Sequence, residues 1–229
     1  QATGKFVPFE FLHFIGRESI VDVHLGDQTH QEVTVLFCDI RDYTTIAEDM
    51  SPEDNFKMIN SFVGKMGPII KQNRGFVNQF IGDAIMAIFP KNGKYALQAA
   101  IEMQIRLSEY NKDRIEKGRI PIQVGIGLHT GPLIMGIIGD ANRTDTTTIA
   151  DTVNIASRME GLTKYYGVQI LISQDSYRCL SNHEDFHFRI LGEVLVKGKN
   201  RPVKIYECYD GEESEMFNMK KEMNSAFNE

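Results

Sequence analysis

The stretch "VLFCDIRDYT", Val35–Thr44, joins a buried strand to two acids and sets the interpretation of the rest of the chain. Four apolar residues run directly into Asp39, and a second acid, Asp42, follows within a short polar turn. An aspartate after a strand ordinarily caps a helix or forms a turn. A chemical role for Asp39 requires other polar residues that the fold brings to the same strand end.

The residues on both sides of this stretch alternate between strand and helix patterns. A β-branched and apolar run predicts a buried strand over 32–40. Ser51-Pro52 begins a helix that ends at the "NRG" turn, 73–75, because serine is a preferred cap and proline fits the first turn. Its apolar positions at helical spacing are Phe56, Ile59, Val63, Met66 and Ile70.

A hairpin and a second helix follow. "FVNQFIGDAIMAIFP", 76–90, consists of two short apolar runs joined by Gly82-Asp83, which is a strong hairpin signal. Residues 93–117 are predicted to be helical, with one apolar stripe formed by Ala96, Ala100, Met103, Leu107 and Tyr110.

The C-terminal half adds strands around a third helix. "IPIQVGIGLHTGPLIMGIIG", 120–139, predicts two strands around a turn at Thr130-Gly131-Pro132. A helix is predicted over 151–166 with Gly167 beyond its end, and its apolar face is Ile155, Met159, Leu162 and Tyr166. The remaining strands are predicted over 168–173, 186–196 and 202–209.

This order of elements predicts an α/β (α+β) fold, a ferredoxin-like βαββαβ sandwich with additional strands. We expect the helices to cover one face of the sheet. Residues 1–31 are amphipathic without a regular period, so we expect them to pack on the body or on a partner.

The net charge of −6 argues against a nucleic-acid partner. Residues 210–229 hold six acids and two lysines, which leaves about −2 for the body and no basic patch. Three distant cysteines without a CxxC pair suit a reducing compartment. The given residues show no signal-peptide pattern and no apolar run of about 18 residues. We therefore expect a cytoplasmic domain from a larger parent protein, which can itself be membrane-attached.

The two strand ends suggest a metal site. Asp39 ends the first strand and Asp83 lies at the hairpin tip, and a ferredoxin-like sheet places these strands side by side. Two close carboxylates repel each other unless a divalent cation lies between them, and hard oxygen ligands favour Mg²⁺ or Mn²⁺. Backbone N–H groups of Ile40–Thr44, leading into a helix, can hold phosphate oxygens. The residues alone thus predict a nucleotide–metal site, with capping and turn formation as the alternative.

Four motifs, "TVLFCDIRDYT", "FIGDAIMAIFP", "VGIGLHTG" and "DTVNIASRMEG", have the order and spacing of the class III nucleotidyl cyclases. The resemblance to this adenylate and guanylate cyclase family covers about 32–209. It implies a cyclase catalytic domain over 32–209, preceded by a transducer segment over 1–31 and followed by an acidic tail over 210–229. The first segment also resembles the short transducing element of many bacterial members.

The resemblance implies roles at the two strand ends. Asp39 and Asp83 match the metal-binding aspartates, which hold two Mg²⁺ or Mn²⁺ ions with the Ile40 carbonyl. One ion would favour ionisation of the ribose 3′-OH and the other would bind the triphosphate. In-line attack of the 3′-OH on the α-phosphorus would give a cyclic 3′,5′-monophosphate and pyrophosphate, with no evident general base. Tyr43 and Thr44 would contact substrate.

Asn154 and Arg158 match the family's transition-state pair. They lie four residues apart in the predicted helix and so share a face. The resemblance implies that Arg158 stabilises charge on the phosphate and that Asn154 orients the ribose; an ordinary solvated pair is the alternative. Lys197 is assigned to the triphosphate, and Lys199 is the alternative.

Base selection departs from the family pattern. Adenylate cyclases usually have Lys where this chain has Gln79 and Asp or Thr where it has Thr147, whereas guanylate cyclases tend to have Glu and Cys. A glutamine amide can donate to adenine or accept from guanine. Thr147 favours ATP, so we expect an adenylate cyclase. The alternatives are a guanylate or mixed-specificity cyclase and, less favoured, a silent regulatory domain.

Two further expectations follow from the resemblance. Arg41-Asp42 occupy places where the family commonly has a small residue and glycine, so Asp42 adds charge near the phosphates, faces solvent or caps the next helix. The family's metal aspartates meet its Asn–Arg pair only across a dimer interface. A homodimer with two equivalent sites is therefore implied, together with an upstream sensor or transducer domain in the parent protein.

Overall fold

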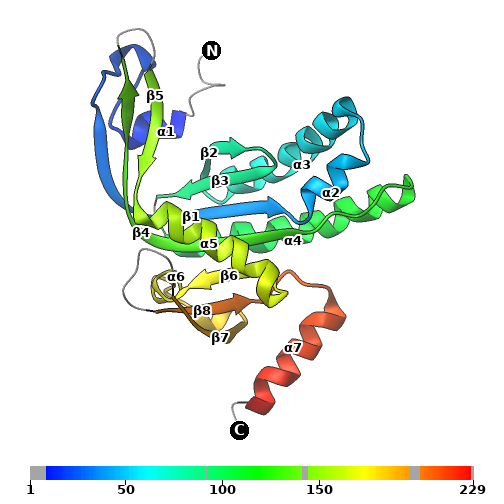
Figure 1. Ribbon diagram of the computed structural model, residues 1–229. Coiled ribbons are helices and arrows are strands. Elements are labelled where there is room, and N and C mark those ends of the chain that lie inside the picture. Colours follow the sequence, from blue (N-terminus) through cyan, green and yellow to red (C-terminus); the bar gives the residue numbers. More distant parts are fainter. Residues whose placement is uncertain (1–8, 91, 141–143, 196–201, 228–229) are drawn as a thin grey trace.

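The computed structural model describes residues 9–90, 92–140, 144–195 and 202–227 (Figure 1). Lys197 and Lys199, the two candidates for the triphosphate contact, lie outside these described residues.

The structure is built on one eight-stranded sheet in the order β2-β3-β1-β4-β6-β8-β7, with β5 paired to β4 beside this path (Figure 1). Strand β1 lies between β3 and β4 and is antiparallel to both. The strands are β1 (Gln28–Ile40), β2 (Phe76–Ile81), β3 (Ala84–Phe89), β4 (Val124–Gly139), β5 (Thr144–Ile149), β6 (Ile170–Ser173), β7 (Phe188–Val194) and β8 (Val203–Cys208). The order β2-β3-β1-β4, with helical crossovers, is the predicted ferredoxin-like arrangement.

The helices begin and end at local signals that the sequence contains. Ser51 Oγ accepts a hydrogen bond from Asp54 N at the start of α3, and Gly167 ends α5 with φ of 63°. The α-helices are α1 (Phe9–Phe14), α2 (Tyr43–Glu48), α3 (Pro52–Gln72), α4 (Gly93–Glu116), α5 (Asp151–Tyr166), α6 (Gln174–Arg178) and α7 (Ser214–Phe227), and the 3₁₀ helices are η2 (Ile20–Asp22) and η3 (His183–Asp185). In the described residues, no helix is long and apolar enough to span a membrane.

Helices lie on both faces of the sheet, so the expectation that they cover one face is wrong. Leu36 and Cys38 of β1 pack with α3 and α4, whereas Val35 and Phe37 belong to a second core with α1. A third cluster joins β6 and β8 to the inner face of α5. The physical reason is visible in the unbroken apolar run of β1, since a strand that is apolar at every position is buried on both sides.

The prediction of two strands around Thr130-Gly131-Pro132 is also wrong. β4 runs unbroken from Val124 to Gly139, and the three residues pair with Thr34, Val33 and Glu32 of β1. A Cβ added to Gly131 would lie 2.7 Å from Thr152 Oγ1, so the glycine permits close approach of α5. The far half of β4, the first residues of β1 and β5 together form an arm that projects from the sheet (Figure 1). Strand β5 has no counterpart among the predictions.

The apolar stripe of α3 differs from the predicted one. Met66 and Ile70 are buried as expected, but Phe56 is 68% exposed. Met58 and Phe62, which the stripe omitted, are buried instead. The described part of residues 1–31 packs on the body as expected, because Phe11, Leu12 and Phe14 of α1 are buried in the second core.

The C-terminal helix α7 belongs to the predicted acidic tail and contacts strands β7 and β8 through individual side chains. Lys220 is buried, and its Nζ lies 2.6 Å from Glu207 Oε1 in β8. Arg189 Nη2 of β7 lies 2.6 Å from the other oxygen of the same carboxylate. A buried carboxylate with two cationic partners therefore attaches α7 to the edge of the sheet. The division of the chain at residues 31 and 209 stays a prediction.

Candidate active site

Asp39 and Asp83 lie at the same end of the sheet. Asp39 is the next-to-last residue of β1, and Asp83 lies in the turn between β2 and β3. The pairing of β1 with β3 ends at Cys38 and Ile85, so the next residues of the two strands bring the turn beside Asp39 and Ile40. The fold thus places the two predicted metal aspartates side by side.

The ionised form of the Asp83 carboxylate is destabilised by its surroundings. Burial, followed by the neighbouring Asp39 carboxylate, raises the pKa of Asp83 from 3.8 to about 7. Within the described residues, Asp83 Oδ2 is buried and lacks a hydrogen-bond partner. Asp39 Oδ1 accepts a hydrogen bond of 3.0 Å from Ile40 N. An orphaned carboxylate oxygen beside a second carboxylate fits a divalent cation.

Glu160 of α5 is a third carboxylate at this end, and sequence reasoning missed it. A Cβ added to Gly125, which pairs with Asp39 from β4, would lie 2.8 Å from Glu160 Oε1. Burial and the charge of Asp39 raise the pKa of Glu160 to about 7. Its spacing of four residues from the buried Ala156 is a signal that could have found it. In the part of the chain that is described, however, no three His, Cys, Asp or Glu residues are grouped to hold a metal ion.

Helix α5 lies directly against β4 because glycines leave room for it. A Cβ on Gly127 would lie 2.0 Å from Glu160 N, and one on Gly125 would lie 2.1 Å from Thr163 Oγ1. The buried positions of α5 repeat at helical spacing and face the sheet. They are Thr152, Ile155, Ala156, Met159 and Thr163.

Asn154 and Arg158 share one side of α5, as predicted from their spacing, and this side is turned away from β4. Asn154 is exposed and Arg158 is half-buried. Each residue turns the helix by about 100°, so both lie roughly opposite the inner position Ala156. Asp39 has the strand parity of Val35 and Phe37, and it therefore points to the face that α5 covers. In one chain, the Asn–Arg pair and the aspartates lie on different sides of α5.

The predicted base-selecting residues lie on strands near exposed apolar side chains. Gln79 is exposed on the edge strand β2, where the register shifts by one residue and pairs it with Met86. Thr147 is half-buried on β5. The neighbouring Phe80 and Ile149 are 52% and 61% exposed.

Tyr43 and Thr44 form the first turn of α2, next to the end of β1. Asn55 Nδ2 donates a hydrogen bond of 2.8 Å to the Tyr43 hydroxyl, so the ring is used to hold α2 against α3. Thr44 is exposed. The backbone N–H groups of this turn have no intrahelical acceptor and are the groups that can meet an anion.

Arg41 and Asp42 connect the end of β1 to the C-terminal end of α5. Arg41 Nη2 donates to the carbonyl oxygens of Thr163, at 3.3 Å, and Val168. Asp42 has a φ of 54°, a left-handed conformation that aspartate tolerates, and its Oδ1 lies 2.6 Å from Lys164 Nζ. Its side chain makes no capping hydrogen bond to α2. Of the three roles open for Asp42, an ion pair on the solvent-exposed surface is the one observed.

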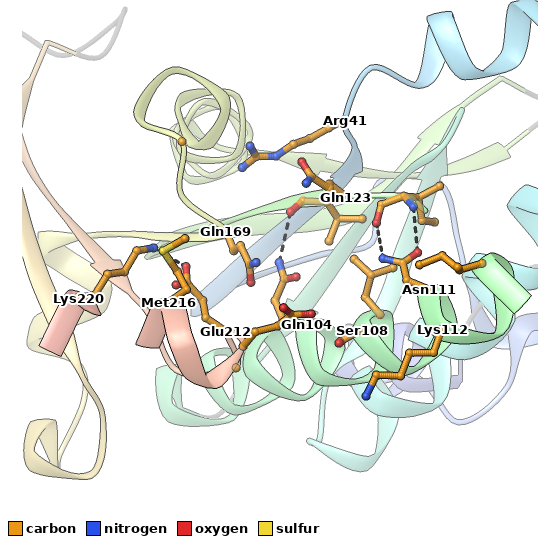
Figure 2. A pocket seen from close by; sticks show the side chains of 17 residues that line it. Arg41, Gln104, Ser108, Asn111, Lys112, Gln123, Gln169, Glu212, Met216 and Lys220 are labelled. Carbon is orange, nitrogen blue, oxygen red and sulfur yellow. Dashed lines mark hydrogen bonds and ion pairs between the residues drawn. The ribbon is translucent and has the colours of Figure 1, made fainter. Parts of the chain in front are cut away.

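Two cavities lie near these elements. One, of about 480 Å³, is enclosed by the C-terminal half of α4, the start of β4 and α7, and Arg41 lies at one wall (Figure 2). The side-chain amide of Asn111 in this cavity is already hydrogen-bonded to the backbone, since it donates to the Ile122 carbonyl oxygen and accepts from Ile122 N. The other, of about 500 Å³, lies at the start of α5 beside His129 and Arg178. Neither cavity is lined by the two aspartates.

The chain matches the family described as the adenylate and guanylate cyclase catalytic domain over residues 25–210. An adenylate cyclase of Anabaena cylindrica is 44% identical over 209 residues, which is 89% of this chain and 42% of that protein. The chain therefore spans less than half of this curated relative.

Two solved structures have similar folds. The adenylyl cyclase CyaB from P. aeruginosa superposes with a TM-score of 0.71 at 28% identity, covering 81% of this chain and 97% of that one. The guanylyl cyclase Cya2 superposes with a TM-score of 0.70, also at 28% identity, covering 81% and 95%. Matched along most of its length, and with two aspartates brought together at the end of a ferredoxin-like sheet, the chain belongs to the adenylate and guanylate cyclase catalytic domain family.

Proposed function

We propose that this chain is the catalytic domain of an adenylate cyclase, which converts ATP into 3′,5′-cyclic AMP and pyrophosphate in a homodimer. The observation that carries the proposal is the Asp39–Asp83 pair. A carboxyl with a pKa of about 7 and an orphaned oxygen is an unfavourable group unless a cation binds it. The pair therefore supports a site for Mg²⁺ or Mn²⁺.

In this proposal the two aspartates and the Ile40 carbonyl hold two divalent ions. When bound, the ions supply Lewis-acid activation of the ribose 3′-OH and neutralise the triphosphate. The first turn of α2, at Tyr43 and Thr44, offers backbone N–H groups to phosphate oxygens.

Asn154 orients the ribose, and the Arg158 guanidinium stabilises negative charge that develops on the phosphate during attack. Lys197 neutralises the triphosphate, with Lys199 as the alternative. These two lysines fall outside the described residues, so their role rests on the family resemblance alone.

The position of Asn154 and Arg158 supports a homodimer. Both lie on the side of α5 turned away from Asp39, so a second chain is needed to bring an Asn–Arg pair to the same nucleotide. Exposed apolar side chains on β2 and on the arm offer a surface for this contact. They are Phe80 at 52%, Ile81 at 47%, Ile138 at 52% and Ile149 at 61% exposure.

The choice of ATP rests on Thr147 and on similarity to a protein named adenylate cyclase. A guanylyl cyclase superposes almost as well as an adenylyl cyclase, so the fold is neutral on the base. Gln79 can serve either base through its amide. A guanylate or mixed-specificity cyclase is the second candidate. The cytoplasmic location and the upstream sensor domain remain predictions.

The test incubates purified protein at high concentration with ATP or GTP and with Mg²⁺ or Mn²⁺, and identifies the products by chromatography. The control variant is Asp39→Ala with Asp83→Ala. Asp113→Asn, an exposed acid of α4 paired with Lys117, is a matched control that we expect to remain active.

We expect cyclic AMP from ATP and its loss in the double variant. Cyclic GMP as the main product would favour the second candidate and keep the mechanism. A dimeric sample that forms neither product with either metal would instead point to a silent regulatory domain.

A further inference from the structure

Arg41 and Asp42 form a connection between two functional elements of one chain. They directly follow Asp39 and Ile40, and their side chains reach the last turn of α5, the helix that carries Asn154 and Arg158. Figure 2 shows Arg41 extending from the end of β1 toward this helix. The proposed metal end and the proposed transition-state helix are therefore joined by direct contacts.

The arginine contact is the stronger of the two. Arg41 is half-buried, and its Nη2 donates to the carbonyl oxygens of Thr163 and Val168 at the end of α5. The Thr163 carbonyl oxygen also accepts a hydrogen bond from Val168 N, so the guanidinium adds a second donor there and interacts favourably with the helix dipole. The Asp42–Lys164 ion pair is more than 60% exposed on both sides and is screened by solvent.

Helix α5 can transmit this constraint to its outer face. Its inner face rests on β4 at Gly125 and Gly127, where added Cβ atoms would overlap helix atoms at about 2 Å. Thr163 is five residues from Arg158, which corresponds to roughly 7.5 Å along the helix axis. A shift of the helix end therefore moves the Arg158 guanidinium by a comparable amount.

We propose that Arg41 is a positioning residue that fixes α5, and with it Asn154 and Arg158, relative to the metal-binding end of the same chain. The inference rests on the proposed function. In the proposed homodimer each chain gives its aspartates to one site and its Asn–Arg pair to the other. Arg41 then couples the two sites, with Asp42–Lys164 as a weaker second contact.

A local role is the competing explanation. Arg41 N donates to Gln123 O at 2.8 Å, which extends the pairing of β1 with β4 beyond Ile40. If Arg41 only supports the strand end, its substitution lowers activity only in the chain that supplies the aspartates to the active site. If Arg41 positions α5, its substitution lowers activity in the chain that supplies the Asn–Arg pair.

A mixed dimer separates these roles. One chain carries Asn154→Ala and Arg158→Ala and supplies only aspartates, and the other carries Asp39→Ala and Asp83→Ala and supplies only the Asn–Arg pair. Two affinity tags allow the mixed dimer to be purified with a single complete site. Arg41→Gln is then placed in one chain or in the other, and kcat and the Mn²⁺ half-saturation concentration are measured.

We expect Arg41→Gln in the chain that supplies the Asn–Arg pair to lower kcat by roughly 10-fold, because displacement of about 1 Å is costly in catalysis. The Mn²⁺ half-saturation should not change, since the intact aspartates belong to the other chain. Arg106→Gln in the same chain removes an exposed ion pair on α4 and is the matched control. An effect of Arg41→Gln confined to the chain that supplies the aspartates would overturn the proposal.

A second variant guards against loss of folding. Lys164→Gln removes only the exposed contact, and in the chain that supplies the Asn–Arg pair we expect a two- to threefold lower kcat, because an exposed ion pair contributes little. Unchanged kcat for both variants, in dimers with normal melting curves, would refute the coupling. An inactive parent mixed dimer would refute the shared site itself, and with it both the proposed function and this inference.

Discussion

The metal-binding end of the sheet and the outer face of α5 differ in how much a single chain reveals about them. At the sheet end, Asp39 and Asp83 lie side by side with Glu160 of α5 nearby, and the pKa of Asp83 and of Glu160 is raised to about 7. On the outer face of α5, Asn154 is exposed and Arg158 is half-buried, as on many solvated helices. Both regions are assigned to one reaction, and the two raised pKa values belong to the first.

This difference follows from what each region lacks. Carboxylates that await cations repel each other in the folded chain, so the cost is visible without the ligand. A helix face that binds the nucleotide of a second chain needs no buried charge in its own chain. The aspartate half of the proposed shared site can therefore be recognised by its raised pKa values. The Asn–Arg half is recognised by its sequence motif.

The sharpest test of the comparison sets Asp83→Asn against Arg158→Ala. We expect both to lower kcat by roughly 100-fold or more, because each removes charge stabilisation from the transition state. Only Asp83→Asn should maintain or raise the melting temperature of the metal-free protein above pH 7, since it removes a repelled carboxylate. A lower melting temperature for Asp83→Asn in this range would contradict the electrostatic interpretation.

Gly127→Ala tests whether the two regions share α5 as a rigid link. An added Cβ would lie 2.0 Å from Glu160 N, so the helix must move away from β4. We expect a loss of about 1–3 kcal/mol in the free energy of unfolding and a lower kcat. Denaturant titration measures the first quantity. Gly161→Ala, on the exposed side of the same helix with no atom within 4 Å of its added Cβ, is the control and should be neutral or stabilising.

Gln79→Lys tests whether the residue at this position of β2 selects the nucleotide base. A lysine at this exposed position of β2 donates only, whereas the glutamine amide both donates and accepts. We expect the ratio of kcat/KM for ATP over GTP to rise by about 10-fold, since a hydrogen bond to a charged group contributes roughly 1.5–3 kcal/mol. Steady-state kinetics with both nucleotides measure the ratio, and a preference that shifts toward GTP would contradict the assignment.

The smallest expected effect is the pH dependence of stability without metal. The folded pKa of Asp83 and of Glu160 is about 7, above the ordinary values of 3.8 and 4.5. Between these values the folded chain keeps protons that the unfolded chain has released. Their contribution to the free energy of unfolding therefore falls as pH rises from about 4 to 7 and then levels off.

Thermal melts across this range measure the trend, and Mg²⁺ or Mn²⁺ should reverse it by binding the ionised carboxylates. The double variant Asp83→Asn and Glu160→Gln should flatten the metal-free curve. A slope that persists unchanged in this variant would assign the pH dependence to other groups.

Local signals explain which predictions the structure confirms. The cap at Ser51, the turn at Gly82-Asp83 and the end of α5 at Gly167 each depend on a few neighbouring residues. By contrast, the prediction of a turn at Gly131 is wrong, because the missing side chain of this glycine makes room for Thr152. A glycine in a turn and a glycine at a close contact between elements look the same in the sequence, and only the tertiary structure distinguishes them.

The sequence by itself determined the helices α3, α4 and α5, the hairpin of β2 and β3, the family and the placement of Asp39 and Asp83 at two neighbouring strand ends. These features depend on short-range propensity, periodicity and motif spacing, which adjacent residues specify. Tertiary structure alone decided that α5 covers the second face, that Glu160 joins the carboxylates and that Arg41 reaches Thr163. Each of these contacts joins residues that are far apart in the sequence through the packing of a helix on a strand. Local sequence patterns do not specify which distant residues will meet.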